Sequence, residues 1–292
     1  MTKQIYCDII NWILIFFGSD ILKLLCIDGN SIINRAFYGI KLLTTKDGLY
    51  TNAVYGFINI LNRLLDSEKP DGVAVAFDLK KPTFRHLKYA EYKAGRKGMP
   101  EELRGQMPIL KEWLNLAGYH CIECETFEAD DILGTLARLC EESGDQCVIS
   151  TGDRDSLQLI SDKTRVVLVG NKENINFTKE VLFEKYGLTP EEMIELKALM
   201  GDSSDNIPGV AGVGEKTATD LISRYHSIDY IYENLDSLEI KEGVRNKLAV
   251  GKEMAFLSRE LGTICKTAPI NENISDYATR ERQSGDLARL MT

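Results

Sequence analysis

The stretch 23–31, KLLCIDGNS, indicates the fold most directly, because it is a short apolar run that ends in an aspartate. Three more apolar runs follow at 73–77, 147–150 and 166–169, with a weaker one at 119–123. Amphipathic stretches of helical spacing separate them, at 53–66, 101–117 and 129–142. Strands that alternate with helices are typical of a mostly parallel sheet, and continuous apolar runs indicate strands covered on both faces. We therefore predict an α/β domain.

A different pattern begins after about residue 178, where the strand signal stops. Helical patterns follow one another at 179–186, 190–200, 215–225, 228–234 and 243–259. Thr189 and Pro190 are typical of a helix start, with the threonine as the cap and the proline in the first turn. We predict an α/β domain over 23–185 and a smaller helical domain over 186–270. Residues 1–22 are predicted to be an N-terminal extension, and the polar residues 271–292 a linker stub.

The composition is that of an ordinary globular protein of 292 residues, 44% of them hydrophobic and 27% charged. The seven cysteines are odd in number and irregularly spaced, which favours a reducing cytoplasm over a disulfide framework. Cys121 and Cys124 form a CxxC pair, but no second pair completes a zinc site. The apolar run 9–17 is shorter than the roughly 20 residues of a membrane span and lacks the features of a signal peptide. We expect a cytoplasmic protein without a membrane partner.

Acidic residues follow the predicted strands at the points where they end. Asp28 closes the first run and Asp78 the second, and a pair of aspartates follows 147–150. The carboxyl ends of parallel strands meet at one edge of a sheet, so these side chains are predicted to lie together. Two further acidic sets lie in TFEADDILG and GDSSDNIPG. The candidate metal ligands are Asp28, Asp78, Glu128, Asp130, Asp131, Asp153, Asp155, Asp202 and Asp205.

Clustered carboxylates repel one another unless cations neutralise them. Oxygen ligands without nearby histidine or cysteine favour Mg²⁺ or Mn²⁺, and more carboxylates than one ion needs favour two ions. The alternative is that each acidic set is a helix cap or a solvated turn, a role that any single pair could fill. Four sets at the ends of strands and helices together favour the metal site.

Positive charge is concentrated in residues 80–111, although the whole chain has a net charge of −9. Nine Lys and Arg residues against three Glu residues give this segment +6 and leave −15 for the rest. Beside an acidic metal site, a positive segment can bind substrate phosphates, and the interleaved Tyr89 and Tyr92 offer faces for stacked bases. The alternative is a solvated charged face. The predicted DNA contacts of this segment are Lys80, Lys81, Arg85 and Tyr92.

The segment 207–218, IPGVAGVGEKTA, is a glycine-rich turn that leads into a predicted helix. Glycines let the backbone approach a ligand closely, and the N–H groups at a helix start can bind phosphate. The spacing matches neither a P-loop nor a dinucleotide fingerprint. A hairpin that binds a nucleic-acid backbone fits better, and a plain connection between helices is the alternative. The predicted contacts of this hairpin are Gly209, Gly212, Gly214, Lys216 and Thr217.

Seven segments occur in order between Lys23 and Pro269: IDGNSIINRAFYGI, TTKDGLYTNAVYGF, AFDLKKPTFRH, YKAGRKGMPEELRGQ, FEADDILGTLA, TGDRDSLQL and GDSSDNIPGVAGVGEKTA. Together they resemble the flap endonuclease family, in particular the 5′-nuclease domain of bacterial DNA polymerase I. The resemblance implies a PIN-type, resolvase-like α/β domain followed by a helix–hairpin–helix domain. It makes 23–185 the catalytic domain and 186–270 the DNA-binding domain.

The resemblance also implies an activity, which is metal-dependent 5′–3′ exonuclease and flap endonuclease cleavage of DNA in replication primer removal and repair. It places the metal ligands of the family on all nine carboxylates, and the cations of its helical arch on Lys93 and Arg96, with Arg85 just before the arch. We predict that Lys93 and Arg96 are catalytic and polarise the scissile phosphate. The hairpin of the family also holds a monovalent cation, usually K⁺.

The implied partners are DNA with 5′ flaps, nicks or 5′ ends, and RNA–DNA hybrids. The protein is expected to be a monomer, either on its own or fused to a DNA polymerase. Two alternatives remain: a DNA-binding fragment that has lost catalysis, which would lack several carboxylates, and a PIN-type ribonuclease, which would lack the helical domain. The sequence contains both features, which favours the nuclease.

Overall fold

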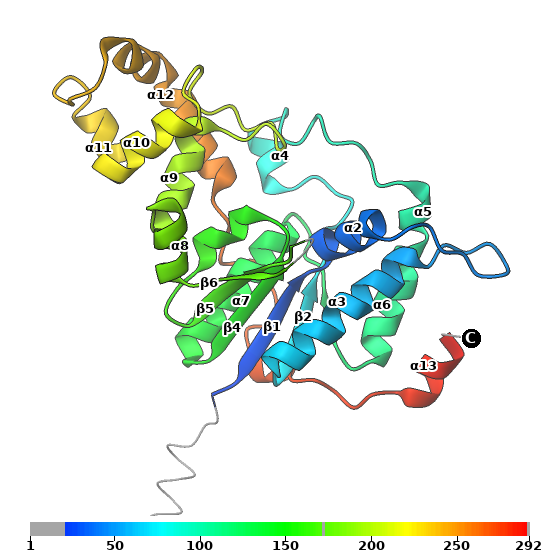
Figure 1. Cartoon of the computed structure of the whole chain (residues 1–292). Helices are drawn as coiled ribbons and strands as arrows, with labels where there is room; N and C mark the ends of the chain where they lie inside the picture. Colours follow the sequence, from blue (N-terminus) through cyan, green and yellow to red (C-terminus); the bar gives the residue numbers. More distant parts are fainter. Residues whose placement is uncertain (1–20, 171–172, 291–292) are drawn as a thin grey trace, which may run out of the picture.

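A six-stranded sheet forms the centre of the computed structural model, which describes residues 21–170 and 173–290 (Figure 1). The strand order is β3-β2-β1-β4-β5-β6, and the strands are β1 (Lys23–Asp28), β2 (Gly72–Ala76), β3 (His120–Ile122), β4 (Gln146–Thr151), β5 (Thr164–Leu168) and β6 (Ile175–Phe177). The first five are parallel, which confirms the predicted α/β class. The sequence did not indicate β6, a three-residue strand that pairs antiparallel with β5.

Helices cover both faces of the sheet, because alternate residues of each strand point to opposite sides. In β1, Leu25 and Ile27 face α2 (Gly29–Gly39), α3 (Asn52–Glu68) and α6 (Gln106–Leu116), while Leu24 and Cys26 face α7 (Ala129–Ser143). All four side chains are fully buried. The predicted helix at 101–117 is interrupted at Gly105, which separates the four-residue α5 (Glu101–Arg104) from α6. A single-turn helix, α4 (Phe84–Lys88), follows β2.

The second half of the described chain is helical, as predicted. Its helices are α8 (Lys179–Tyr186), α9 (Pro190–Met200), α10 (Glu215–Tyr225), α11 (Ile228–Glu233) and α12 (Glu242–Gly262). Thr189 and Glu192 form a reciprocal capping box at the start of α9, which confirms the predicted helix start. Leu199, Leu221 and Leu248 belong to a separate apolar core between α9, α10 and α12.

The C-terminal segment packs against the α/β domain, so the prediction of a linker stub is wrong for the described residues 271–290. A short 3₁₀ helix (Ile274–Tyr277) and α13 (Ser284–Leu290) lie on its surface (Figure 1). The amide of Arg280 donates to the Gly118 carbonyl at 3.0 Å. Tyr277 and Leu287 are buried. The few large apolar residues of this segment are too widely spaced to show a period, but Ile274, Tyr277 and Leu287 enter the core.

The predicted N-terminal extension lies mostly outside the described residues. No helix among residues 21–170 and 173–290 is long and apolar enough to cross a membrane.

Candidate active site

Three strands end at one edge of the sheet, and each positions a carboxylate there. Asp28 is the last residue of β1, and its Oδ1 accepts a hydrogen bond from the Ser31 amide at 2.9 Å. Its Oδ2 accepts from Oγ1 of Thr151, the last residue of β4, at 2.7 Å. Asp78 follows β2, and its Oδ1 accepts from the Ala129 amide at 2.7 Å. These contacts fix the orientation of both carboxylates before any ligand binds.

A polar cavity of about 230 Å³ lies at this edge. Asn30, Ser31 and Asn34 of α2 form one side of it, and Lys93 and Arg96 form another. The sequence predicted that its acidic residues would lie together, and the structure brings six of the nine to this cavity: Asp28, Asp78, Glu128, Asp130, Asp153 and Asp205.

A second carboxylate group adjoins the first. Asp155, Asp202 and Asp205 each offer an oxygen, and these oxygens lie within 4.8 Å of one another. An open cleft of about 670 Å³ passes this group and is lined by Asp153, Asp155 and Asp202. Asp153 lines both spaces, so the two carboxylate groups form a continuous acidic edge.

Burial and mutual repulsion disfavour the charged form of these groups. Burial raises the pKa of Asp28 to about 6, against the hydrogen bonds from Ser31 and Thr151. Burial, together with repulsion from Asp28 and Asp153, raises the pKa of Asp130 well above its ordinary value. A cation would relieve this repulsion. The donors are all carboxylate oxygens, so the site suits a hard divalent ion such as Mg²⁺ or Mn²⁺.

Two predicted site residues, Asp131 and Arg85, form a buried ion pair instead. The Asp131 side chain is 0% exposed, and both its oxygens accept from the Arg85 guanidinium at 2.8 Å. Asp131 also accepts from the Glu128 and Cys265 amides at 3.0 and 2.8 Å. All its acceptor capacity is therefore used inside the protein, and its prediction as a metal ligand is wrong. Arg85 is 3% exposed, so its prediction as a DNA contact is also wrong.

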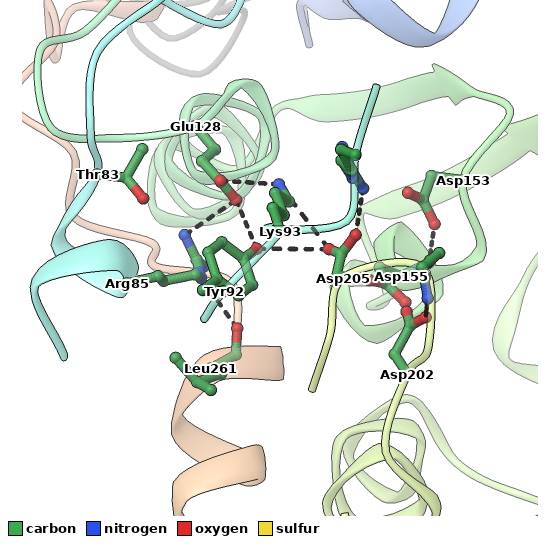
Figure 2. Close-up of polar contacts among 12 residues, drawn as sticks. Thr83, Arg85, Tyr92, Lys93, Glu128, Asp153, Asp155, Asp202, Asp205 and Leu261 are labelled. Atoms are coloured by element: carbon green, nitrogen blue, oxygen red, sulfur yellow. Dashed lines mark hydrogen bonds and ion pairs between the residues drawn. The ribbon is translucent and has the colours of Figure 1, made fainter. Parts of the chain in front are cut away.

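The structure likewise contradicts the prediction that Tyr92 stacks on bases. Tyr92 is 3% exposed, and its ring packs against Ile207 and Leu261 and edge-on to His86. Its hydroxyl donates to Glu128 Oε2 at 3.0 Å (Figure 2). An aromatic residue between charged ones is an ambiguous signal, since a ring that is buried and one that stacks on bases have the same sequence context.

Lys93 and Arg96, the predicted catalytic cations, contact the acidic cavity directly. Lys93 Nζ lies 2.8 Å from Glu128 Oε1 and 3.8 Å from Asp205 Oδ2 (Figure 2). Arg96 forms an ion pair with Asp205. Lys93 has a left-handed backbone, with φ at 56°, and its amide donates to the Asp205 carbonyl at 2.8 Å. The two cations are thus held where a phosphate at the acidic edge would meet them.

The predicted hairpin connects α9 to α10, and two of its three glycines are required by the backbone. Gly209 has φ at 59°, and a Cβ there would lie 2.3 Å from the Gly201 nitrogen. Gly212 has φ at 77°, and its carbonyl accepts from Lys247 Nζ at 2.9 Å. Gly214 precedes α10 with an ordinary negative φ and open space around its Cβ position. Nothing in the structure tests the predicted K⁺.

The other predicted DNA contacts lie at the surface. Lys80, Lys81 and Lys216 are exposed, and Thr217 in the first turn of α10 is half-buried. Lys81 forms an exposed ion pair with Glu125. Their contacts with DNA stay predictions.

One charged residue of the site gave no sequence signal. Lys197 of α9 is 7% exposed, and its Nζ pairs with Asp155 and Asp202. It occurs within a helical pattern, where a lysine normally lies in solvent. Only its position five residues before Asp202 connects it with the site.

Both domains of this chain match a single family. The family model "5′-3′ exonuclease, N-terminal resolvase-like domain" matches residues 23–187, and "5′-3′ exonuclease, C-terminal SAM fold" matches residues 188–285. The chain therefore belongs to the 5′–3′ exonuclease family.

Its sequence relatives identify the type within that family. DNA polymerase I of Bacillus subtilis is 47% identical over 255 residues, which are 87% of this chain and 29% of that protein. DNA polymerase I of Caldicellulosiruptor bescii is 46% identical over 265 residues, 89% of this chain and 31% of that protein. The chain is thus a 5′–3′ exonuclease of the DNA polymerase I type, and it spans about a third of the length of these relatives.

Solved structures confirm the predicted fold. The 5′-exonuclease of bacteriophage T5 with bound zinc matches with a TM-score of 0.69 and 22% identity, over 92% of this chain and 100% of that one. The catalytic core of Rad2 in complex with a DNA substrate matches with a TM-score of 0.60 and 18% identity, over 92% of this chain and 85% of that one.

Proposed function

We propose that this chain is a structure-specific 5′ nuclease that hydrolyses DNA with two divalent ions, Mg²⁺ or Mn²⁺. The observation that carries the proposal is the pair of adjoining carboxylate groups, one at the ends of β1 and β2 and the other between the segments that follow β4 and α9. One group surrounds Asp28 and Asp130, and the other comprises Asp155, Asp202 and Asp205. Two neighbouring ions suit the in-line displacement of a phosphodiester oxygen.

When bound, such ions supply a nucleophilic hydroxide from water and stabilise the leaving oxygen. The chain's own contribution is charge and orientation. Thr151 and the Ser31 amide hold the Asp28 carboxylate, and the Ala129 amide holds that of Asp78. Lys93 is positioned to donate to a non-bridging phosphate oxygen, where negative charge increases in the transition state. The products are a 5′-phosphate and a 3′-hydroxyl.

A histidine-based mechanism is not needed, since each histidine is engaged elsewhere. His86 contacts Thr83 Oγ1 at 2.9 Å, and His226 contacts Glu192 at 2.6 Å. His120 lies on the strand β3 and contacts the Ala278 carbonyl at 3.1 Å. A water molecule therefore remains the proposed nucleophile.

The proposed substrates are DNA molecules with 5′ flaps, nicks or 5′ ends, and RNA–DNA hybrids. Support comes from the hairpin, where exposed glycines and the free N–H groups at the start of α10 suit phosphate contacts that do not depend on sequence. We further propose that the hairpin holds a K⁺ ion, that the chain acts as a monomer, and that it works beside a polymerase in primer removal and repair, as its relatives' name suggests. Its described cysteines are all free, which supports a cytoplasmic location.

The double substitution Asp130→Asn and Asp153→Asn tests the role of the metal-binding carboxylates. Both residues line the acidic cavity, whereas the proposed duplex contacts lie on the hairpin. We expect cleavage of a 5′-flap DNA in Mg²⁺ to be abolished while flap binding, measured by gel shift in Ca²⁺, is retained. Circular dichroism confirms that the variant is folded. Full cleavage by the folded double variant would refute the two-ion proposal.

The substitutions Lys93→Ala and Arg96→Ala test the catalytic role of the two arch cations. A positive group held against the reacting phosphate contributes about 10²–10³ to the rate, so each variant should slow single-turnover cleavage by that factor. Lys80→Ala is the matched control, since Lys80 is exposed and outside the cavity. It should mainly weaken binding and lower the salt slope by about one. If all three variants lost only affinity, Lys93 and Arg96 would not be catalytic.

A further inference from the structure

Lys197 contacts two members of the second carboxylate group, whereas Lys93 approaches only the third, Asp205, at 3.8 Å. Its Nζ lies 2.8 Å from Asp202 Oδ2 and also forms an ion pair with Asp155. Asp205, the third member, offers an oxygen within 4.8 Å of the other two. The ammonium therefore contacts two of the three side chains that would bind a divalent ion.

The lysine cannot easily leave this position, because its stem is packed. A Cβ built on Gly262 of α12 would lie 2.8 Å from Lys197 Cδ, so the stem runs directly over that glycine. The residue is 7% exposed. Arg96 differs, since its side chain pairs with Asp205 and is 47% exposed.

An ammonium and a divalent ion compete for the same carboxylate oxygens. Mg²⁺ requires its ligands at about 2.0–2.1 Å, and bound oxygens lose most of their capacity to accept from a lysine. A fixed positive charge beside the ion also repels it. Both effects lower the affinity of this group for an ion. The cavity around Asp28 and Asp130 also contains a lysine, Lys93. Its ion-pair partners are Glu128 and Asp205, however, and no ion pair among the described residues engages Asp28 or Asp130.

We propose that Lys197 is the resident counter-cation of the second metal group. It keeps Asp155 and Asp202 close together when no ion is present, and it weakens ion binding there when the ion arrives. The carboxylates of this group are thereby held in position before an ion arrives, but an ion binds to them only after one has bound in the cavity around Asp28. This inference rests on the proposed two-ion function, and it makes Lys197 a positioning residue that acts through the carboxylates.

The test is a Mn²⁺ titration of the whole chain without DNA, in which electron paramagnetic resonance measures the free and bound Mn²⁺. Wild-type protein should bind two ions, one of them weakly. Lys197→Met removes the charge and keeps an apolar stem, and it should tighten the weak ion at least tenfold. Lys197→Arg keeps the charge and should leave that ion weak. Lys179→Met is the matched control, because Lys179 forms an exposed ion pair with Asp162 and its loss should change neither ion.

Thermal unfolding in EDTA gives a second measurement. Lys197→Met should unfold at a lower temperature than wild type, since three carboxylates then face one another without the Lys197 ammonium. Mn²⁺ should restore the unfolding temperature. A variant that folds only with Mn²⁺ supports the proposal in the same way, and Lys197→Gln should show both effects in milder form.

The outcomes separate this inference from the proposed function. Two ions in the wild type, with the weak ion unchanged or weaker in Lys197→Met and Lys197→Gln, would overturn the role of Lys197 alone. A single ion in the wild type would overturn the two-ion function and this inference with it. If Lys197 were only structural, its substitution would lower the stability of the protein and would not raise its affinity for Mn²⁺.

Discussion

At the scale of single residues, Arg85 links three parts of the chain that are distant in sequence. Its guanidinium donates to both Asp131 oxygens at 2.8 Å and lies 3.4 Å from Glu128. It also donates to the Leu261 carbonyl at 2.9 Å (Figure 2). A further hydrogen bond goes to the Thr263 carbonyl at 2.8 Å. Arg85 therefore connects the start of α7 with the end of α12. Its positive charge serves the interior of the protein rather than a phosphate.

Arg85→Met should destabilise the protein by about 3–5 kcal/mol, because it leaves the Asp131 carboxylate buried and unpaired. Urea unfolding in EDTA measures the loss. Lys179→Met is the control, since its partner Asp162 is exposed and loss of a solvent-screened ion pair should change the stability little. Below its unfolding transition, the Arg85 variant should bind duplex DNA as tightly as wild type. If the Arg85→Met variant had a normal unfolding midpoint but bound DNA more weakly, Arg85 would again be interpreted as a DNA contact.

Sequence reasoning succeeded for residues whose role is set by local context and failed where distant contacts decide. Asp28 and Asp78 were predictable, because a carboxylate that ends a parallel strand is carried to the sheet edge by the fold itself. Arg85 was not, since its partner Leu261 lies 176 residues away. Lys197 was not, since nothing in a helical pattern marks a lysine that is buried.

At the scale of elements, the hairpin between α9 and α10 depends on a close backbone crossing. Gly209 and Gly201 approach so closely that neither accommodates a side chain. The Gly209 amide donates to Ser258 Oγ of α12 at 2.8 Å, which ties the hairpin to that helix. Gly214, by contrast, leaves the start of α10 uncovered. The glycines of one motif thus have two different functions, one in folding and one in exposing N–H groups.

Gly209→Ala should lower both stability and affinity for duplex DNA. The left-handed φ costs about 1–2 kcal/mol for a residue with a Cβ, and the contact with Gly201 adds to it. Gly214→Ala is the control, because its backbone is ordinary and its surroundings are open, so it should cost less than about 1 kcal/mol. Urea unfolding and fluorescence anisotropy with a labelled duplex measure both properties. Equal losses in the two variants would contradict the close-crossing argument.

Elements were predictable where a periodic pattern extends over a whole helix or strand. The parallel strands and the helices after residue 178 agree with the patterns in the sequence. The three-residue β6 and the C-terminal segment were missed, because each depends on pairing with a distant part of the chain. Ala278 bridges to Gly72, a contact that no local pattern encodes.

At the scale of the whole molecule, the metal-free protein should lose stability as the pH rises. Burial raises the pKa of Asp28 to about 6, above the value of about 3.9 in an unfolded chain. Between these values the folded state holds the proton more tightly, so the contribution of Asp28 is present below pH 4 and is lost as the pH rises through 6. The expected loss is about 3 kcal/mol.

Urea unfolding in EDTA from pH 4.5 to 7.5 measures this dependence. Asp28→Asn has no titratable group at this position and should show a shallower dependence than wild type. Saturating Mg²⁺ should remove most of the difference, since an ion neutralises the carboxylates that otherwise repel. Suppose that wild-type protein in EDTA is more stable at pH 7 than at pH 5, and that the Asp28→Asn variant shows the same difference. That result would contradict the burial argument.

The helix α12 crosses from one half of the molecule to the other, and this has a consequence for the length of the product. Its 21 residues span about 30 Å at 1.5 Å per residue. Lys247, in the first half of α12, donates from its Nζ to the Gly212 carbonyl of the hairpin, and the Leu261 carbonyl at the C-terminal end of α12 accepts from Arg85 beside the acidic edge. A duplex bound at the hairpin, as proposed above, would lie at a fixed distance from the carboxylates, because α12 contacts both regions. We therefore expect the proposed nuclease to cleave at a constant number of nucleotides from the end of the duplex.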